Sequence, residues 1–411
     1  MRRMLMLVTL LLAPALARAD ASPDTLAGVV QQPVVEVSTS RVGEHTPQPV
    51  SRLKREELVK LDWGQDTPMA LATQPGAFAY SDAGNGIGYS YLTLRGFPQR
   101  RISVLVNGVP LNDPESHEVY WIDHPELISA TSELQIQRGV GSALYGAAAL
   151  GGSVNVETSP FGDAPRASVT GGGTFGTRRV IFEGASGPLT GGWSLYGRYA
   201  RVETDGYRDD SWSRLWSYVL GARRVLGNQT FRVNLYGGPE ETHLAYLGND
   251  PDHMNGLVTG DVDRDRRFNP LTYDGERDHF FEPHYELIHD WAANPALTVS
   301  QTLYWFDGRG YYDEKRDGVP LSDYRLPRIP TTDTLLYPRD HYAQDSTGVL
   351  IRDAQGRATI VNFDVTRRRE IVDRQAGWIP RARWHYGGGA LTVGGELRFH
   401  DGHHFGSVRC V

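Results

Sequence analysis

The sequence contains the stretch Leu134-Gln135-Ile136-Gln137-Arg138-Gly139-Val140-Gly141-Ser142-Ala143-Leu144-Tyr145-Gly146. This stretch joins a β-prone run at 133–137 to a second one at 153–157. Its glycines invite comparison with nucleotide-binding loops. No Gly-Lys-Ser/Thr follows them, which excludes a Walker loop, and Leu144 stands where a dinucleotide-binding loop has its third glycine. The stretch therefore predicts structural turns packed closely against neighbouring backbone. The glycines expected at these turns are Gly139, Gly141, Gly146, Gly151 and Gly152.

The residues around this stretch predict a small α/β domain. Residues 91–95 and 102–106 have the composition of strands, and each is followed by a turn signal, Gly96 and Asn107-Gly108 respectively. Helical patterns occupy residues 51–58 and 67–72. We therefore expect one compact domain over residues 49–160.

The N-terminal residues have the pattern of an export signal. Arg2 and Arg3 precede a short apolar core at 4–12, and Ala17-Arg18-Ala19 is a small-x-small cleavage site. The core is too short to span about 30 Å of hydrocarbon as an anchor helix. We expect residues 1–19 to be a signal peptide and residues 20–48 to be an N-terminal extension of an exported protein.

The composition narrows the class of protein. Hydrophobic residues make up 40% of the 411 residues and charged residues 22%, which is too polar for a bundle of transmembrane helices. The 46 glycines and 20 tyrosines suggest many strands and turns. The net charge of −7 argues against a nucleic-acid partner. Cys410 is the single cysteine, so no disulfide can form within the chain.

Residues 161–411 show an alternation of period two, as in Phe231-Arg232-Val233-Asn234-Leu235, which gives each strand one apolar and one polar face. A β-sandwich shows the same alternation. Here, however, short turns alternate with long polar loops at 240–281 and 309–372, as in a transmembrane barrel. About nine strands are expected, near residues 165–173, 178–186, 193–203, 213–225, 230–239, 282–292, 297–308, 373–386 and 391–401.

Two motifs in this sequence resemble the plug domain of TonB-dependent outer-membrane receptors. The first is Leu94-Arg95-Gly96-Phe97 with the segment 101–111 after it, and the second runs from Leu134 to Gly146 and closes at 151–156. Asn112-Asp113-Pro114-Glu115-Ser116-His117-Glu118-Val119-Tyr120-Trp121 is similar to a branch of iron-siderophore receptors. The resemblance implies a small α/β plug domain at 49–160, followed at 161–411 by an antiparallel transmembrane β-barrel in the outer membrane of a Gram-negative bacterium.

The resemblance also implies partners and site residues. The segment Val34-Val35-Glu36-Val37-Ser38-Thr39 matches the position of the TonB box, a strand that pairs with TonB of the inner-membrane energising complex. Arg95 and Arg138 match two plug arginines that form a lock with glutamates of the barrel wall. The implied ligand is a small iron-siderophore complex, and outer-membrane lipid surrounds the barrel. A cobalamin or oligosaccharide receptor, or a surface adhesin without transport, are the alternatives.

The chain departs from the family in its number of strands. A barrel that holds a plug has about 22 strands, whereas about nine are expected here. We therefore expect a partial barrel, truncated within the family's barrel, that does not transport by itself.

Motifs for enzymatic chemistry are absent from the sequence. It contains neither Gly-x-Ser-x-Gly nor His-Glu-x-x-His, and we expect no enzyme, no cofactor and no resident metal. Residues 261–265 have the opening spacing of a calcium loop, but Arg266 and Thr272 replace its glycine and its glutamate. The histidines at 400, 403 and 404 lie close together in the sequence, and a metal site or a polar strand end explains them equally well.

Overall fold

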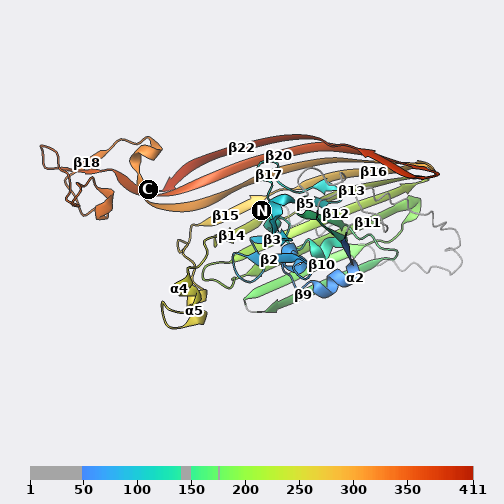
Figure 1. Ribbon diagram of the computed structural model, residues 1–411, viewed down its shortest axis with the longest axis horizontal. Helices are drawn as coiled ribbons and strands as arrows, with labels where there is room; N and C mark the ends of the chain where they lie inside the picture. Colours follow the sequence, from blue (N-terminus) through green and yellow to red (C-terminus); the bar gives the residue numbers. More distant parts are fainter. Residues whose placement is uncertain (1–48, 140–149, 175, 411) are drawn as a thin grey trace, which may run out of the picture. The chain divides into compact units, whose positions relative to one another are not determined.

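The computed structural model describes residues 49–139, 150–174 and 176–410. These residues form a small domain and a large antiparallel sheet (Figure 1). Among them, no helix combines the length and the apolar character that crossing a membrane requires.

The small domain is built on a five-stranded sheet with the order β1-β7-β8-β5-β6. β5 is parallel to β8 and all other neighbours are antiparallel. A second sheet contains β2, β3 and β4. The elements are β1 (Val50–Lys54), α2 (Arg55–Leu61), α3 (Thr67–Leu71), β2 (Ala77–Ser81), β3 (Ser90–Leu94), β4 (Phe97–Pro98), β5 (Ile102–Val106), β6 (Val109–Pro110), β7 (Thr131–Arg138) and β8 (Gly152–Thr158).

The core of the small domain is apolar. Val104, Ile136 and Val154 are no more than 1% exposed, since they lie on adjacent strands of the central sheet. Burial of such side chains is the main favourable term in folding a domain of this size. The motif that runs from Leu134 to Gly146 and closes at 151–156 therefore contributes to two core strands, β7 and β8.

Several turns expected at the motif residues lie at the ends of strands in the small domain. Asn107 and Gly108 both have positive φ angles, 53° and 82°, as a two-residue hairpin turn requires. A Cβ added to Gly152 would lie 2.3 Å from the carbonyl oxygen of Gln137, so β7 and β8 could not pair as they do with a larger residue there. Gly96 and Gly139 also have positive φ angles, and Gly151 lies against Phe97. Gly141 and Gly146 are outside the described residues.

The large sheet confirms the predicted strands. Its twelve strand segments form nine long strands, because three strands are interrupted in mid-length, between β13 and β14, β15 and β16, and β21 and β22. The segments are β9 (Arg166–Thr174), β10 (Thr177–Ala185), β11 (Trp193–Thr204), β12 (Ser213–Leu226), β13 (Gln229–Gly237), β14 (Glu240–His243), β15 (Arg277–Phe281), β16 (His284–Asn294), β17 (Leu297–Pro320), β20 (Asn362–Tyr386), β21 (Gly389–Gly394) and β22 (Leu397–Cys410).

Several strands are longer than expected, β17 and β20 among them. β17 has 24 residues and β20 has 25, and they pair from end to end. The loop predicted at 309–372 is therefore shorter and holds β18 (Ile329–Thr331) and β19 (Ala358–Ile360). The other long loop contains α4 (Pro251–Met254) and α5 (Val262–Arg266).

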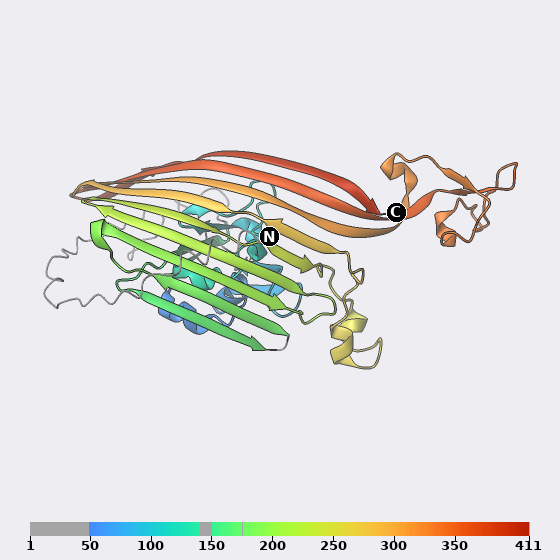
Figure 2. The same cartoon turned by 180° about the vertical axis from the view of Figure 1, so that it is seen from behind.

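The sheet is open along two edges. Within the described residues, β9 pairs only with β10 and β22 pairs only with β20. Figure 2 shows the strands side by side as a curved wall, with the elements of the small domain on one side of it. The small domain and this wall meet along an interface, called the seam below.

Burial in the wall is the reverse of burial in the small domain. Along β16, Glu286 and Asp290 are buried while Leu287 and Trp291 are exposed. The side chains that face the seam are thus largely polar, and those that face away from it are largely apolar. This is the pattern of a strand between a polar lumen and lipid.

Candidate functional site at the seam and its cavity

The strongest link across the seam is an arginine of the wall. Arg179 on β10 donates from Nε and Nη2 to the two carboxylate oxygens of Glu126, at 2.5 and 2.6 Å, and from Nη2 to Asp62 at 2.6 Å. Its side chain is 9% exposed and that of Glu126 is 2% exposed. A bidentate pair removed from water in this way holds the two parts in one geometry.

Two further arginines cross the seam nearby. The buried Arg198 on β11 donates to the Ser129 hydroxyl at 2.9 Å and to the Glu126 carbonyl at 2.6 Å. In the opposite direction, Arg55 of α2 in the small domain donates to both carboxylate oxygens of Glu183 on β10, at 2.7 Å. The segment at 125–129 is therefore the main contact of the small domain with this part of the wall.

Asn107 links its turn to the wall. Its Nδ2 donates to Glu286 Oε2 at 2.7 Å, and Glu286 also accepts from Asn234 and Tyr236 of β13. The carboxylate is 2% exposed and has three donors but no lysine or arginine among the described residues. A residue expected from sequence only as a turn former thus also joins the two parts.

A cavity of about 700 Å³ lies between the small domain and the wall. Carboxylates outnumber arginines in its lining, ten to three. The acidic residues are Asp82, Asp113, Glu115, Asp123, Glu240, Asp278, Glu282, Glu314, Glu370 and Asp373, and the arginines are Arg316, Arg367 and Arg369. Tyr89, Tyr91, Tyr120, Tyr246, Tyr311 and Tyr312 add aromatic surface and hydroxyls. The cavity therefore suits a ligand with cationic or hydrogen-bond-donating groups.

Several of these carboxylates are buried without a basic partner. Asp123, Glu240 and Asp278 are each less than a tenth exposed, and none forms an ion pair with a lysine or arginine in the described ranges. Asp278 accepts a hydrogen bond from the Tyr89 hydroxyl. Burial, together with the neighbouring carboxylate Glu282, raises the pKa of Asp123 well above its ordinary value. The deep end of the cavity therefore gathers acidic side chains that have no basic partner among the described residues.

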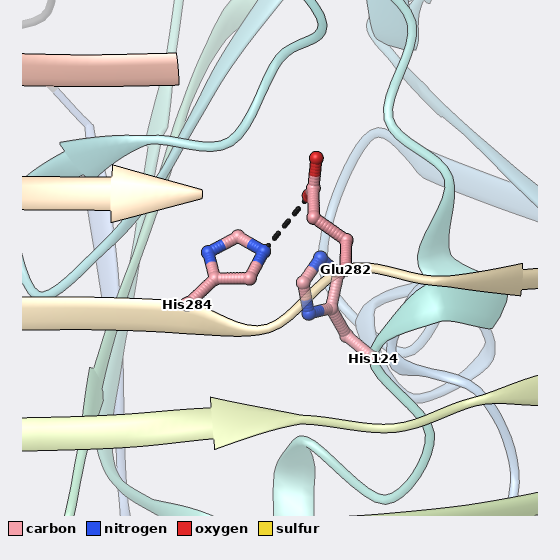
Figure 3. A group of neighbouring side chains, drawn as sticks. All are labelled: His124, Glu282 and His284. Atoms are coloured by element: carbon pink, nitrogen blue, oxygen red, sulfur yellow. Dashed lines mark hydrogen bonds and ion pairs between the residues drawn. The ribbon is translucent and has the colours of Figure 1, made fainter. Parts of the chain in front are cut away.

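Two histidines and a glutamate meet at this deep end (Figure 3). His124 comes from the small domain, whereas Glu282 and His284 come from the junction of β15 and β16. One potential metal-ligating atom from each lies within 4.8 Å of the others. His284 Nε2 lies 2.9 Å from Glu282 Oε2, and the two imidazoles meet edge to face. Burial lowers the pKa of His124 to about 3, so its imidazole is neutral at neutral pH.

The two arginines of the expected lock lie in other surroundings. Arg138 Nη1 donates to the Ser51 hydroxyl at 2.7 Å, inside the small domain. Arg95 is exposed, with a φ angle of 53°. In the part of the chain that the structure describes, neither forms an ion pair with the wall, so their pairing with wall glutamates stays a prediction. The expected TonB box at 34–39 lies outside the described residues.

The histidines of β22 do not form one cluster. His400 lies 2.8 Å from Asp373 and His404 lies 2.7 Å from Glu115, so both face the seam. His403, one residue out of phase, packs against Phe405 instead. Among the aspartates with the spacing of a calcium loop, Asp261 caps the N-terminus of α5 with its side chain.

The sequence alone did not predict the ion pairs across the seam, or the group formed by His124, Glu282 and His284. Arg179 and Glu126 are 53 positions apart, and His124 is more than 150 positions from Glu282. No spacing rule connects such residues. The one available signal was the polar face of each wall strand, where an arginine or glutamate at an inward position requires a partner.

The fold and the sequence are similar to those of known proteins. A small α/β domain held by polar links against a wall that is apolar outside defines the class of plugged β-barrel proteins. Residues 43–153 match the family model of the TonB-dependent Receptor Plug Domain. Residues 43–153 are therefore a plug domain of this family, and the sheet that follows them has the fold of part of a receptor barrel.

The chain is also similar to a curated receptor in sequence and to solved transporter structures in fold. The Ferric enterobactin receptor of Pseudomonas aeruginosa is 26% identical over 222 residues, which cover 49% of this chain and 29% of that receptor. The unliganded ferric citrate transporter FecA has a TM-score of 0.62 at 15% identity, over 89% of this chain and 49% of that one. The copper transporter OprC has a TM-score of 0.59 at 15% identity, over 87% and 46%. The chain thus spans less than half the length of these relatives.

Proposed function

We propose that this chain belongs to a receptor that takes up a scarce nutrient across the outer membrane, most simply a metal-siderophore complex. The observation that carries the proposal is the cavity at the seam, closed on one side by the plug and on the other by the wall. A ligand bound there contacts both parts, so a movement of the plug changes its binding. The ligands for which these relatives are named, ferric enterobactin and ferric citrate, support this class of substrate.

The polar seam also supports transport over simple adhesion. Its contacts are hydrogen bonds and ion pairs, such as Arg179 with Glu126 and Asn107 with Glu286, which water can replace when the plug moves. An adhesin has no use for a separable internal domain. Cobalamin and oligosaccharide receptors share this reasoning and differ only in the ligand.

We propose further that residues 1–19 are removed on export and that the box at 34–39 pairs with TonB. The segment 34–39 is β-prone, and backbone pairing tolerates many side chains but not the loss of a donor. Mass spectrometry of the membrane fraction should find Asp20 as the first residue. An intact Met1 would contradict the export step.

Val35→Pro tests the box in cells that express the receptor containing this chain. Proline removes a backbone donor, so uptake of labelled ferric chelate should fall to the level of a strain without TonB, while binding of the same chelate at the cell surface persists. Val35→Thr, which keeps the donor and the β-propensity, is the matched control and should transport normally. Equal loss of binding and uptake in Val35→Pro would show that the segment is structural.

A further inference from the structure

The group formed by His124, Glu282 and His284 has the donors of a metal site. Two imidazole nitrogens and a carboxylate oxygen are the ligand set of many three-ligand zinc sites, and imidazole favours Zn²⁺, Cu²⁺ and Ni²⁺ over hard ions. His124 and His284 are buried, and Glu282 is partly buried. The three side chains point toward one another in Figure 3.

Within the group, a hydrogen bond joins His284 to Glu282 but none joins either of them to His124. The bond between His284 and Glu282 accounts for Nε2 of His284 and for one oxygen of Glu282. His124 is 8% exposed and lines the cavity, and no hydrogen bond from the described residues occupies its imidazole. A neutral imidazole nitrogen that is not engaged in a hydrogen bond is available as a metal ligand. An ion at the centre of the group would use this nitrogen.

The carboxyl groups around the site also have no lysine or arginine partner among the described residues. Asp123 lies next to His124 in the chain, and its Oδ1 is buried without a hydrogen-bond partner. Glu282 and Asp373 pair only with histidines in the part of the chain that the structure describes. Buried carboxylates without a cation are costly. A divalent cation would offset this charge.

The geometry requires a small adjustment. Ligands at about 2.0–2.1 Å from a tetrahedral zinc ion lie about 3.4 Å apart. The shortest pair in the group is at 2.9 Å and the widest separation is within 4.8 Å. The three donors would therefore have to move closer together for all of them to bind one ion. His124 and Glu282 line the cavity whereas His284 does not, so the ion's remaining coordination position faces the cavity.

We propose that His124, Glu282 and His284 form a binding site for a divalent transition-metal ion of the Zn²⁺ class that bridges the plug and the wall. The site does not depend on the proposed uptake of a ferric chelate, since it is defined by donors from the two parts of the chain. A bound ion adds a link between His124 of the plug and His284 of the wall. Its occupancy therefore stabilises the seam beside the cavity.

The test is Zn²⁺ binding by the full chain in detergent micelles, after removal of metal with a chelator. Competition against a chromophoric zinc chelator should show one saturable site. His124→Gln and His284→Gln should each weaken it by about 100-fold or more, because even loss of a residue that only hydrogen-bonds to a metal ligand costs about 10–100-fold. His289→Gln, on the same strand as His284 but bonded to Gln229 and Gln301, should leave the affinity unchanged.

A second measurement on the unaltered chain covers the case in which a variant does not fold. X-ray absorption at the zinc edge should show two imidazole ligands per ion at about 2.0–2.1 Å. The absence of saturable binding, unchanged binding in the double variant of His124 and His284, or a spectrum without imidazole ligands would each overturn the proposal. Because the assay measures binding of Zn²⁺ alone, a failure of ferric chelate uptake has no effect on its outcome.

Discussion

The plug and the wall use the same β-strand alternation with opposite results. In the plug, Val104 and Ile136 are buried on the faces of a central sheet. In the wall, Glu286 and Arg198 are buried at 2% and 3% exposure, while Leu287 is 41% exposed. The plug has the core of a water-soluble domain, stabilised by apolar burial. The wall has an exposed apolar face, as strands that contact lipid do, and a polar face against the plug.

This difference indicates that the plug can separate from the wall along the seam. An apolar core does not exchange its contacts for water without a large cost in free energy, whereas a polar seam can be rehydrated. We therefore expect the plug to resist unfolding more than the seam resists separation.

Leu134→Ala should destabilise the plug by about 2–5 kcal/mol, because the side chain is fully buried and the substitution leaves a cavity. Leu303→Ala, the same change at a 51% exposed wall position that faces away from the seam, should cost less than about 1 kcal/mol. Denaturant unfolding in detergent, followed by hydrogen exchange of β7, measures both. Equal costs would refute the contrast between the two regions.

Arg179→Ala should weaken the seam by about 3–5 kcal/mol, since it leaves Glu126 buried without its charged partner. Faster hydrogen exchange in α2 and at 125–129 would report the loss. Arg201→Ala is the control, because Arg201 is 53% exposed in its pair with Glu203 and such pairs contribute about 0–1 kcal/mol. Unchanged exchange in Arg179→Ala would mean that this ion pair does not hold the plug.

Arg138→Ala separates the observed seam from the lock that the family resemblance implies. In the structure Arg138 bonds to Ser51 within the plug, so its loss should cost about 1 kcal/mol and change exchange only near β1. A larger effect than that of Arg179→Ala, spread over the plug, would indicate a buried wall carboxylate as the partner of Arg138. Hydrogen exchange on both variants under one set of conditions decides between these outcomes.

Asp66 should make plug stability depend on pH. Burial raises the pKa of this carboxyl from 3.8 to about 8, and the Ser90 hydroxyl donates to it. The folded plug therefore binds the proton more tightly than the unfolded chain does. Its stabilising effect is complete below pH 3.8 and is lost as pH rises through about 8. Asp66→Asn should flatten the pH dependence of unfolding over that range; an unchanged slope would contradict the assignment.

The sequence predicted the strands of the wall well because period-two alternation is a direct consequence of its two different surroundings. It failed at 309–320, a charged stretch taken for a loop, because backbone pairing between β17 and β20 continues beyond the apolar part of the strands. The turn at Asn107-Gly108 followed from local chemistry. The partners of Arg179 and His124 could not be predicted, since they depend on how two separately patterned regions meet.

We expect the wall to present its apolar face to lipid and its polar face to the plug. Single cysteines at each position from 299 to 305 in a Cys410→Ser chain, labelled with a fluorophore and inserted into bilayers with brominated lipid, test it directly. Quenching should alternate along β17, strong at Leu303 and Trp305 and weak at Thr302 and Tyr304, which are buried toward the seam. Uniform quenching, no quenching, or strong quenching at Thr302 and Tyr304 would contradict the account.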